Sequence, residues 1–444
     1  MKLWHKDHVQ TAAAIEQFTV GQDREFDQRL APFDVLGSLA HTHMLQAVGL
    51  MEPAVYAGVQ KGLQDLYVVV SQDNFTLPPS AEDIHSYVEA ELTARLGEGG
   101  KQIHSARSRN DQVLVDIKML LRSELEKTVA AAEPLFVLLQ SLSEKHSQDL
   151  LPGYTHLQLA MPSSFGLWFG AYAESLADDL EALVSAYGIC NKNPLGSAAG
   201  FGSSFPIDRN LTTRLLGFDD LHYNVVYAQM SRGKTERMVA MGLANFADTL
   251  SRLSMDVCLF MNQQFGFMGF PDAYTTGSSI MPHKKNPDVF ELVRSHCNQI
   301  KSLPNEIMLM TTNLPSGYQR DLQLLKTHLF PALQTLQDCF HVLVTMFSVV
   351  EVRPHILSHP SFQPLFTVEA VNQLVLEGMS FRDAYQKVGA QVAAGEFAWD
   401  KPLAHTHLGS MGQLANAAIA ANWQKAKNKF PFNTVQQALE ALLQ

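Results

Sequence analysis

Cysteine is scarce in this chain of 444 residues, and the four that occur lie far apart. Cys190, Cys258, Cys297 and Cys339 form no Cys-x-x-Cys pair and no cluster with the spacing of zinc ligands. This distribution is typical of reduced thiols in the cytosol and not of a disulfide framework. No dinucleotide-binding motif occurs either. We therefore expect a cytoplasmic protein with no metal and no organic cofactor.

Long apolar runs and an excess of basic charge are also missing. No apolar run is long enough to span a bilayer, and the polar start, Met1–His8, lacks the apolar core of a signal peptide. Lys and Arg number 33 against 44 Asp and Glu, which gives a formal net charge of −11. A protein that binds nucleic acid would need a basic face. We expect a protein that binds neither a membrane nor nucleic acid, although a local cationic pocket is compatible with this balance.

Strand-like alternation is nearly absent, whereas helical periodicity is strong. Only Leu66–Val70 alternates at period two, and this run is too short to decide. Three runs carry an apolar residue every three or four positions over more than five turns: from Phe165 to Tyr187, from Val239 to Phe260 and from Leu329 to Val350. Such spacing places the apolar side chains on one stripe of a long helix.

Two weaker helical runs, at 111–146 and 287–313, contain Pro134 and Pro304. We expect these prolines to kink or interrupt their helices. Together, the five long helices predict an all-α fold with a central bundle. Because their stripes carry more apolar surface than one bundle needs, we also expect self-association.

The chain is too long for one ordinary core, so two or three domains are expected. Shorter helical segments broken by prolines precede and follow the bundle. The predicted division is an N-terminal helical domain at 1–106, a central bundle at 107–355 that forms the oligomer core, and a small C-terminal helical domain at 356–444.

Three polar segments interrupt the helical pattern, at 105–112, 153–158 and 277–287. Each is expected to end where a helix begins, so that free backbone N–H groups are available to bind anions. Taken singly, they have ordinary interpretations: a helix cap with solvated charges, a structural histidine, and a flexible turn with solvated lysines. Their joint occurrence at the ends of bundle helices favours a functional site.

The third segment carries a specific resemblance. Gly277–Asn286 reads Gly-Ser-Ser-x-Met-Pro-x-Lys-x-Asn, which matches the signature of the fumarase/aspartase superfamily at every fixed position. Within this superfamily, Arg107–Gln112, Gly153–Gln158 and the run from Tyr318 to Lys326 resemble the argininosuccinate lyase family. Shorter echoes are found at Phe26–Leu30, Gly37–His41, Glu82–His85 and Pro206–Arg209, and the resemblance extends from near residue 18 to about 330.

The resemblance implies β-elimination of argininosuccinate to L-arginine and fumarate, in arginine biosynthesis. It also implies a homotetramer in which each active site combines segments from three subunits, with a small-molecule substrate and no cofactor. The chain departs from the family at four places. The usual Trp-Gly-Gly-Arg start is Trp4–Asp7, and the Gly-Lys that follows Arg294 in the family is Ser295-His296. Gly21 or no residue stands where family members carry a serine before Phe26–Leu30, and Leu324 and Leu325 replace an acidic pair.

The chemistry requires a base and donors that stabilise negative charge. Elimination removes a proton next to a carboxylate, so an aci-carboxylate must be stabilised by preorganised donors. By resemblance, Ser278 is the base, and its ionisation must be favoured by N–H groups and Lys284. His156 takes part in proton transfer and is oriented by Glu291. The implied substrate-binding residues are Arg109, Asn110, Thr155, Ser279, Asn286, Tyr318, Gln323 and Lys326, with Asp83 and His85 at the arginine end.

Three other interpretations stay open. A different lyase or hydratase of the superfamily, such as adenylosuccinate lyase, fumarase or aspartase, should not combine the Tyr318–Lys326 run with Arg107–Gln112. An inactive structural homologue, as the delta-crystallins of eye lenses are, should have lost a catalytic residue, but all four are present: Ser278, His156, Lys284 and Glu291. A helical scaffold that only binds partners leaves the polar segments unexplained.

Overall fold

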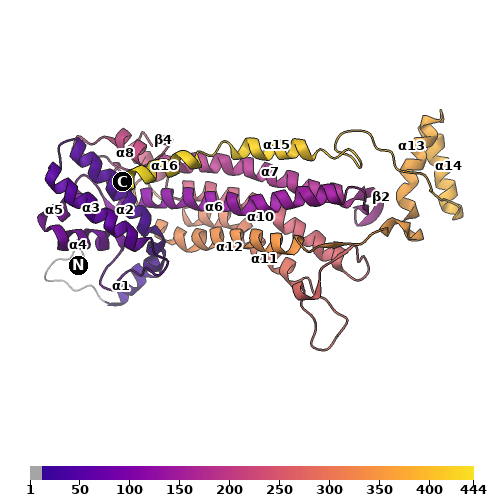
Figure 1. The fold of residues 1–444 in the computed structure, drawn as a ribbon, viewed down its shortest axis with the longest axis horizontal. Coiled ribbons are helices and arrows are strands. Elements are labelled where there is room, and N and C mark those ends of the chain that lie inside the picture. The colour runs from indigo at the N-terminus through magenta and orange to yellow at the C-terminus, as the bar shows by residue number, and fades with distance from the viewer. Residues whose placement is uncertain (1–12) are drawn as a thin grey trace.

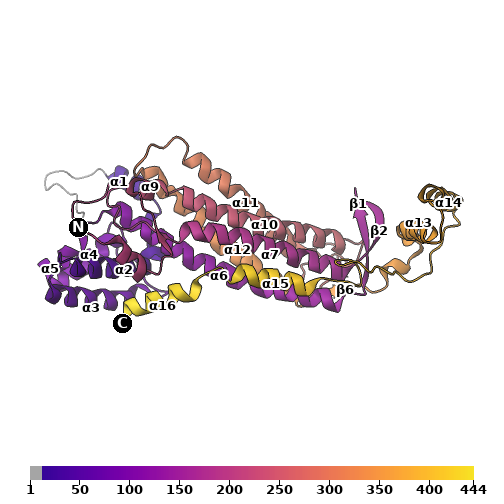
Figure 2. The same ribbon diagram turned by 90° about the horizontal axis from the view of Figure 1, so that it is seen from above.

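The computed structural model describes residues 13–444 as an elongated, mostly helical molecule (Figures 1 and 2). The polar start, Met1–His8, lies outside the described residues. Long helices follow the longest axis of the molecule, and shorter helices lie at both ends. Within residues 13–444 the strands form three two-stranded sheets. The predicted all-α fold class is therefore confirmed.

Five long helices form the middle of the molecule. They are α6 (Arg109–Lys145), α7 (Phe165–Cys190), α10 (Lys234–Met261), α11 (Asp288–Met310) and α12 (Leu325–Phe347). Each coincides with one of the five periodic runs, so the predicted bundle is confirmed. The apolar stripes face inward: Leu176, Phe246 and Phe340 are completely buried, and the rings of the two phenylalanines meet edge to face with centroids 5.4 Å apart.

The bundle helices continue through their prolines. Pro134 lies inside α6 and Pro304 inside α11, so neither proline interrupts its helix, and the expected kink stays a prediction. A proline in a helix interior removes one hydrogen bond and costs about 3 kcal/mol. Apolar packing against neighbouring helices offsets this cost, because Leu135 and Leu303, which follow or precede the two prolines, are buried in the core.

The N-terminal part forms a second core around α2. Its helices are α1 (Ala13–Val20), α2 (Asp23–Ala47), α3 (Pro53–Val70), α4 (Ile84–Leu96) and the short α5 (Glu98–Lys101). Leu66–Val70, the run that alternates in the sequence, is the end of α3. Helix α2 packs against α3, α4 and α6, so the N-terminal part covers the start of the bundle.

Strand pairs and short helices connect the long helices. Near the N-terminal part, β3 (Lys192–Asn193) pairs with β4 (Asp220–Leu221), next to α8 (Arg209–Leu215) and α9 (Val225–Met230). At the opposite end of the bundle, β1 (Leu150–Thr155) and β2 (Gln158–Ser164) form an antiparallel hairpin, and β5 (Met268–Gly269) pairs with β6 (Glu351–Val352). The sequence did not predict this hairpin.

The C-terminal part first extends beyond the bundle and then returns along it. Helices α13 (Thr367–Leu376) and α14 (Phe381–Ala394) pack together at the end remote from the N-terminal part. Helix α15 (Asn416–Lys427) lies along α7 and also contacts α6, where its Trp423 stacks on Phe136 with centroids 4.4 Å apart. Helix α16 (Phe432–Leu443) contacts α2 and α8. The domain boundaries drawn from the sequence stay a prediction.

Two further expectations concern cysteines and membranes. All four cysteines are free thiols. Among residues 13–444, no helix combines the length and the apolar composition that crossing a membrane requires.

Candidate active site

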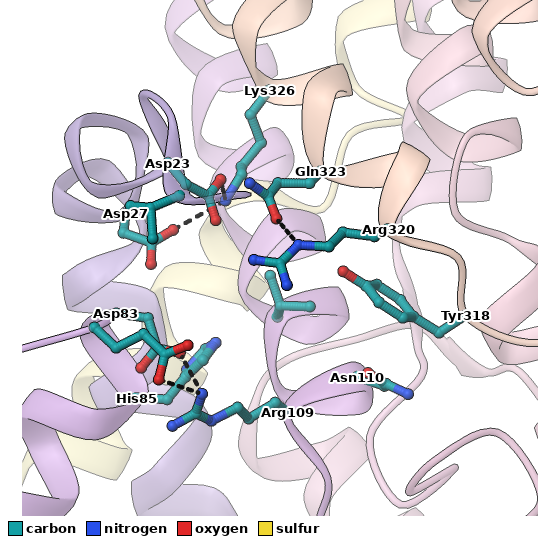
Figure 3. A pocket seen from close by; sticks show the side chains of 13 residues that line it. Asp23, Asp27, Asp83, His85, Arg109, Asn110, Tyr318, Arg320, Gln323 and Lys326 are labelled. Atoms are coloured by element: carbon teal, nitrogen blue, oxygen red, sulfur yellow. Dashed lines mark hydrogen bonds and ion pairs between the residues drawn. The ribbon is translucent and has the colours of Figure 1, made fainter. Parts of the chain in front are cut away.

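A polar cavity of about 240 Å³ lies where the N-terminal helices meet the starts of α6 and α12 (Figure 3). Its wall is built from the first turns of α2, the start of α4, the start of α6 and the segment that joins α11 to α12. The cavity brings together seven residues that the sequence nominated for substrate binding: Asp83, His85, Arg109, Asn110, Tyr318, Gln323 and Lys326.

The start of α6 is fixed by a capping box, which places Arg109 and Asn110 at the cavity. The Ser108 hydroxyl accepts the N–H of Asn110 at 3.3 Å, and Asp111 accepts the N–H of Ser108 at 2.9 Å. The second oxygen of Asp111 accepts the N–H groups of Gly196 and Ala198 at 3.0 and 2.8 Å. Burial raises the pKa of Asp111 to about 6, although these hydrogen bonds act to lower it. The segment at 105–112 therefore opens a helix, as predicted.

Arg109 is held in a network of acidic and hydroxyl groups. Its guanidinium lies 2.9 Å from Asp83 and 3.5 Å from Glu82, and it donates to the Ser86 hydroxyl at 2.7 Å (Figure 3). Asp83 also caps α4 by accepting the N–H of Ser86 at 2.7 Å. Burial alone would raise the pKa of Asp83, but the charges of His85 and Arg109 outweigh it and hold that pKa below its usual value.

Lys326 brings a second cation to the cavity from the first turn of α12. Its ammonium lies 2.9 Å from Asp27 and 2.5 Å from Asp23, which are one turn apart on α2. Burial by itself would lower the pKa of Lys326, but the two carboxylates reverse this and raise it. The pKa of Asp23 is raised, chiefly by burial and by the charge of Asp27, although Lys326 acts in the opposite direction.

The segment between α11 and α12 closes the cavity on a third side. Arg320 and Gln323 both donate to the backbone carbonyl of Thr19, at 3.0 and 2.9 Å, and the Gln323 side chain also accepts from Arg320 at 3.2 Å. Tyr318 points its hydroxyl toward the cavity (Figure 3). The end of α1 is therefore tied to the same donors that line the site.

Four charged residues of the cavity had no role in the sequence-based prediction: Asp23, Asp27, Glu82 and Arg320. Three of them lie inside motifs that resemble the family, at Phe26–Leu30, Glu82–His85 and Tyr318–Lys326, so a signal existed. For Asp23 the only signal is its spacing of one helical turn from Asp27.

Thr155 and His156 lie outside this cavity, at the turn of the β1–β2 hairpin. Both are exposed, and β2 separates this turn from α7, so the expectation that a helix begins directly after 153–158 is wrong. His156 and Leu157 occupy the two turn positions with φ of 54° and 58°. Two-residue turns of this kind favour Asn-Gly, and a non-glycine residue there stores about 1–3 kcal/mol of strain. Such strain is common where a side chain has a functional position to hold.

Ser278, Ser279, Lys284 and Asn286 lie on the exposed loop before α11. The Ser278 hydroxyl accepts the N–H groups of Ile280 and Met281 at 3.3 and 3.2 Å, so two donors point at its oxygen. Asn286 donates to the Gly277 carbonyl at 3.1 Å and closes the base of the loop. Glu291 is exposed on the first turns of α11.

One chain therefore does not bring all nominated residues together. The cavity lies at the start of α6, whereas the hairpin with His156 lies beyond its end (Figures 1 and 2). The 37 residues of α6 span about 55 Å at 1.5 Å per residue. The Ser278 loop protrudes from the side of the bundle, away from the N-terminal part (Figure 1).

Comparison with known proteins identifies the family of the chain. A family model described as lyase matches residues 6–301. An argininosuccinate lyase of Bacteroides fragilis is 54% identical over 442 residues, which cover 100% of this chain and 99% of the relative. One from Thermotoga neapolitana is 36% identical, over 87% of this chain and 97% of the relative. In fold, the chain is similar to EDDS lyase in complex with formate, with a TM-score of 0.76 at 21% identity over 98% of this chain and 94% of the other.

The helical bundle, the charged cavity and the Gly277–Asn286 signature define a lyase of the fumarase/aspartase superfamily. Sequence identity of 54% to argininosuccinate lyases, along the whole length of the chain, identifies the family within this superfamily. The chain belongs to the argininosuccinate lyase family.

Proposed function

We propose that the protein cleaves argininosuccinate by β-elimination into L-arginine and fumarate, and so acts in arginine biosynthesis. The observation that carries the proposal is the cavity itself, where Arg109, Lys326 and Tyr318 meet from segments far apart in the sequence. The 54% identity to the Bacteroides fragilis enzyme supports the same conclusion.

The charges of the cavity suit this substrate. Argininosuccinate carries three carboxylates, one guanidinium group and an α-amino group. Arg109 and Lys326 offer cations for carboxylates, and the planar fork of arginine fits a carboxylate by two hydrogen bonds. We assign Tyr318, Gln323 and Lys326 to the succinyl part and Asp83 and His85 to the arginine part.

The chemical step needs groups that lie outside this cavity. In the proposed reaction, the Ser278 oxygen takes the proton from the carbon next to a carboxylate. The electrons of that C–H bond first move into the carboxylate to give an aci-carboxylate. They then form the double bond of fumarate as the C–N bond breaks and its electron pair leaves with the guanidine nitrogen. The N–H groups of Ile280 and Met281 favour an ionised Ser278, with Lys284 as the cation of the loop. His156, with Glu291 as its orienting carboxylate, takes part in the proton transfers, and Thr155, Ser279 and Asn286 complete the binding of substrate.

We infer that a complete site combines the cavity of one chain with the hairpin and the loop of others, in a homotetramer. The cavity and the His156 hairpin lie at opposite ends of α6, which supports this inference, since no small hinge motion closes a gap of about 55 Å. Exposed apolar side chains on the bundle also support it, including Met241 and Met255 on α10 and Leu292 and Leu309 on α11. The division into three domains and a cytoplasmic location belong to the same proposal.

The test is the release of fumarate, followed by ultraviolet absorbance, from the purified protein. Argininosuccinate, adenylosuccinate, malate and aspartate are supplied separately. The proposal expects release from argininosuccinate only. Activity with one of the other three compounds instead would keep the lyase chemistry and overturn the assigned substrate. A folded oligomer that is inactive on all four would contradict the proposed function.

A further inference from the structure

Behind the wall of the cavity, His85 is joined to a buried carboxylate. His85 lies on the first turn of α4, and its Nδ1 is 2.7 Å from an oxygen of Asp34 on α2. The same oxygen of Asp34 accepts the side-chain amide of Gln112 at 2.7 Å, and Asp34 is completely buried. His85 also lines the cavity. Because Nδ1 faces Asp34, the ring nitrogen available to a ligand is Nε2.

A second buried carboxylate lies next to the His85–Asp34 pair. Asp116 on α6 is completely buried, and its Oδ2 lies 3.8 Å from Nδ1 of His85. Both oxygens of Asp116, together with Oδ2 of Asp34, lack a hydrogen-bond donor among the residues that the structure describes. Two carboxylates at such a site do not both ionise, because burial and mutual repulsion oppose it.

The surrounding charges decide which carboxyl keeps the proton. Burial and the charge of Asp34 raise the pKa of Asp116 well above its usual value, so Asp116 is the protonated partner. Asp34 stays ionised because the charges of His85 and Arg107 outweigh burial and lower its pKa. Burial alone would lower the pKa of His85, but Asp34 raises it, and Asp83 and Asp27 act in the same direction.

We propose that Asp34, backed by Asp116, is a positioning residue that fixes the tautomer, the ring orientation and the positive charge of His85, so that its Nε2–H binds a carboxylate of the substrate. Figure 3 shows the ring of His85 beside Asp83 and Arg109, at the part of the cavity assigned to the arginine end. The inference rests on the proposed function, because the carboxylates of argininosuccinate are the anions in question. Asp34 does not touch the substrate and acts only through His85.

A divalent metal ion is the rival occupant of this cluster. One ligand atom each from Asp34, His85 and Asp116 lies within 4.8 Å of the others. A tetrahedral zinc ion holds its nitrogen and oxygen ligands about 3.3 Å apart, given bonds near 2.0 Å. The 2.7 Å contact between His85 and Asp34 is shorter and is a direct hydrogen bond. Arg107, whose charge lowers the pKa of Asp34, also opposes an added cation.

The first test is a double-mutant cycle on the full-length protein with argininosuccinate as substrate. Asp34→Asn and His85→Asn should each lower kcat/KM by about ten-fold or more, mainly through KM. The double variant should be no worse than His85→Asn alone, because Asp34 acts through the histidine. Losses that multiply in the double variant would overturn the proposal, since they indicate a separate structural role for Asp34.

The second test is the pH profile of kcat/KM. Without the charge of Asp34, the pKa of His85 falls, so the activity of Asp34→Asn should decline with rising pH earlier than that of wild type and recover in acid. Asp34→Glu keeps the charge and should hold a profile nearer to wild type, although its side chain is larger. Asp179→Asn, a buried carboxylate of α7 remote from the cavity, is the matched control and should leave the profile unchanged. A pH profile of kcat/KM that stays closer to wild type in Asp34→Asn than in Asp34→Glu would contradict the proposal.

Further controls distinguish failure of the proposal from misfolding, from a metal site and from failure of the proposed function. If Asp34→Asn does not fold, Asp34→Glu replaces it in the cycle with His85→Asn; its own loss should be smaller, and the double variant should again be no worse than His85→Asn alone. Stoichiometric zinc or manganese in the purified protein, removed by Asp116→Asn, would overturn the proposal in favour of a metal site. Wild type that releases no fumarate from argininosuccinate contradicts the proposed function, whereas active wild type with multiplying losses contradicts only the role of Asp34.

Discussion

The ammonium of Lys326 lies 2.9 Å from the carboxylate of Asp27, which joins two helices whose contact residues are 299 positions apart in the sequence. Asp23, one turn before Asp27 on α2, approaches the same ammonium at 2.5 Å. A buried cation is tolerated only when it is paired. The two carboxylates therefore fix the start of α12 to α2, and Lys326 stays charged at the wall of the cavity.

Lys326→Met should weaken substrate binding more than it slows turnover. The variant loses the cation for a substrate carboxylate and leaves Asp23 and Asp27 facing each other unpaired. We expect KM for argininosuccinate to rise by about ten-fold or more, measured by fumarate release over a range of concentrations. Lys301→Met is the control, because Lys301 pairs with Asp248 on the bundle surface at 2.8 Å. A KM like that of wild type in Lys326→Met would remove this residue from substrate binding.

Arg109→Lys should reduce kcat/KM although it keeps the positive charge. Arg109 contacts Asp83, Glu82 and Ser86 at once, which needs the several donors of a guanidinium group. We expect a loss of about ten-fold or more, from the free energy of one or more charge-assisted hydrogen bonds. Arg95→Lys, on the exposed side of α4, is the matched substitution and should change nothing measurable. Equal activity of the two variants would show that only the charge at Arg109 matters.

The helical skeleton was predictable because a repeat of three to four residues over many turns has one structural solution. The hairpin was not, because β1 and β2 bury their residues without strict alternation. The pairing of Asp23 with Lys326 could not be foreseen either, since it depends on how α2 and α12 meet. The motif residues of the cavity were predictable as a set. Their separation from His156 within one chain was not, because it follows from the length of α6 in the folded molecule.

Ser278→Ala should fold and assemble normally but turn over far more slowly. Loss of a general base reduces turnover by about 10²- to 10⁴-fold, whereas the cavity that binds substrate is untouched. Fumarate release at saturating argininosuccinate measures the effect. Ser302→Ala, an exposed serine on α11, is the control. Turnover of Ser278→Ala within a few-fold of wild type would exclude Ser278 as the base.

Asp179→Asn should alter how stability depends on pH. Asp179 is buried beside Thr249, which donates to it at 2.6 Å, and burial raises its pKa to about 7. Its folded pKa lies above the unfolded value of 3.8, so the native state binds more protons and stability falls as pH rises from about 4 to 7.

The variant cannot ionise, so it should gain up to about 4 kcal/mol on wild type as the pH rises from about 4 to 8, from three pKa units of about 1.4 kcal/mol each. Urea unfolding at a fixed protein concentration measures this difference. The same pH dependence in wild type and variant would contradict the raised pKa of Asp179.

The central claim, that one active site takes its parts from several chains, is tested most directly by mixing two variants that are each impaired at low argininosuccinate concentrations. Ser278→Ala and Lys326→Met are produced together with different tags, and hybrids that carry both tags are purified and assayed for fumarate release. In the proposed tetramer, Lys326 and Ser278 of one site come from different chains. About a quarter of the sites in a random hybrid then have both native residues, and activity at argininosuccinate concentrations well below the wild-type KM should rise to roughly that fraction of wild type. Hybrids no more active than the Lys326→Met parent would contradict the account and place both residues of a site on the same chain.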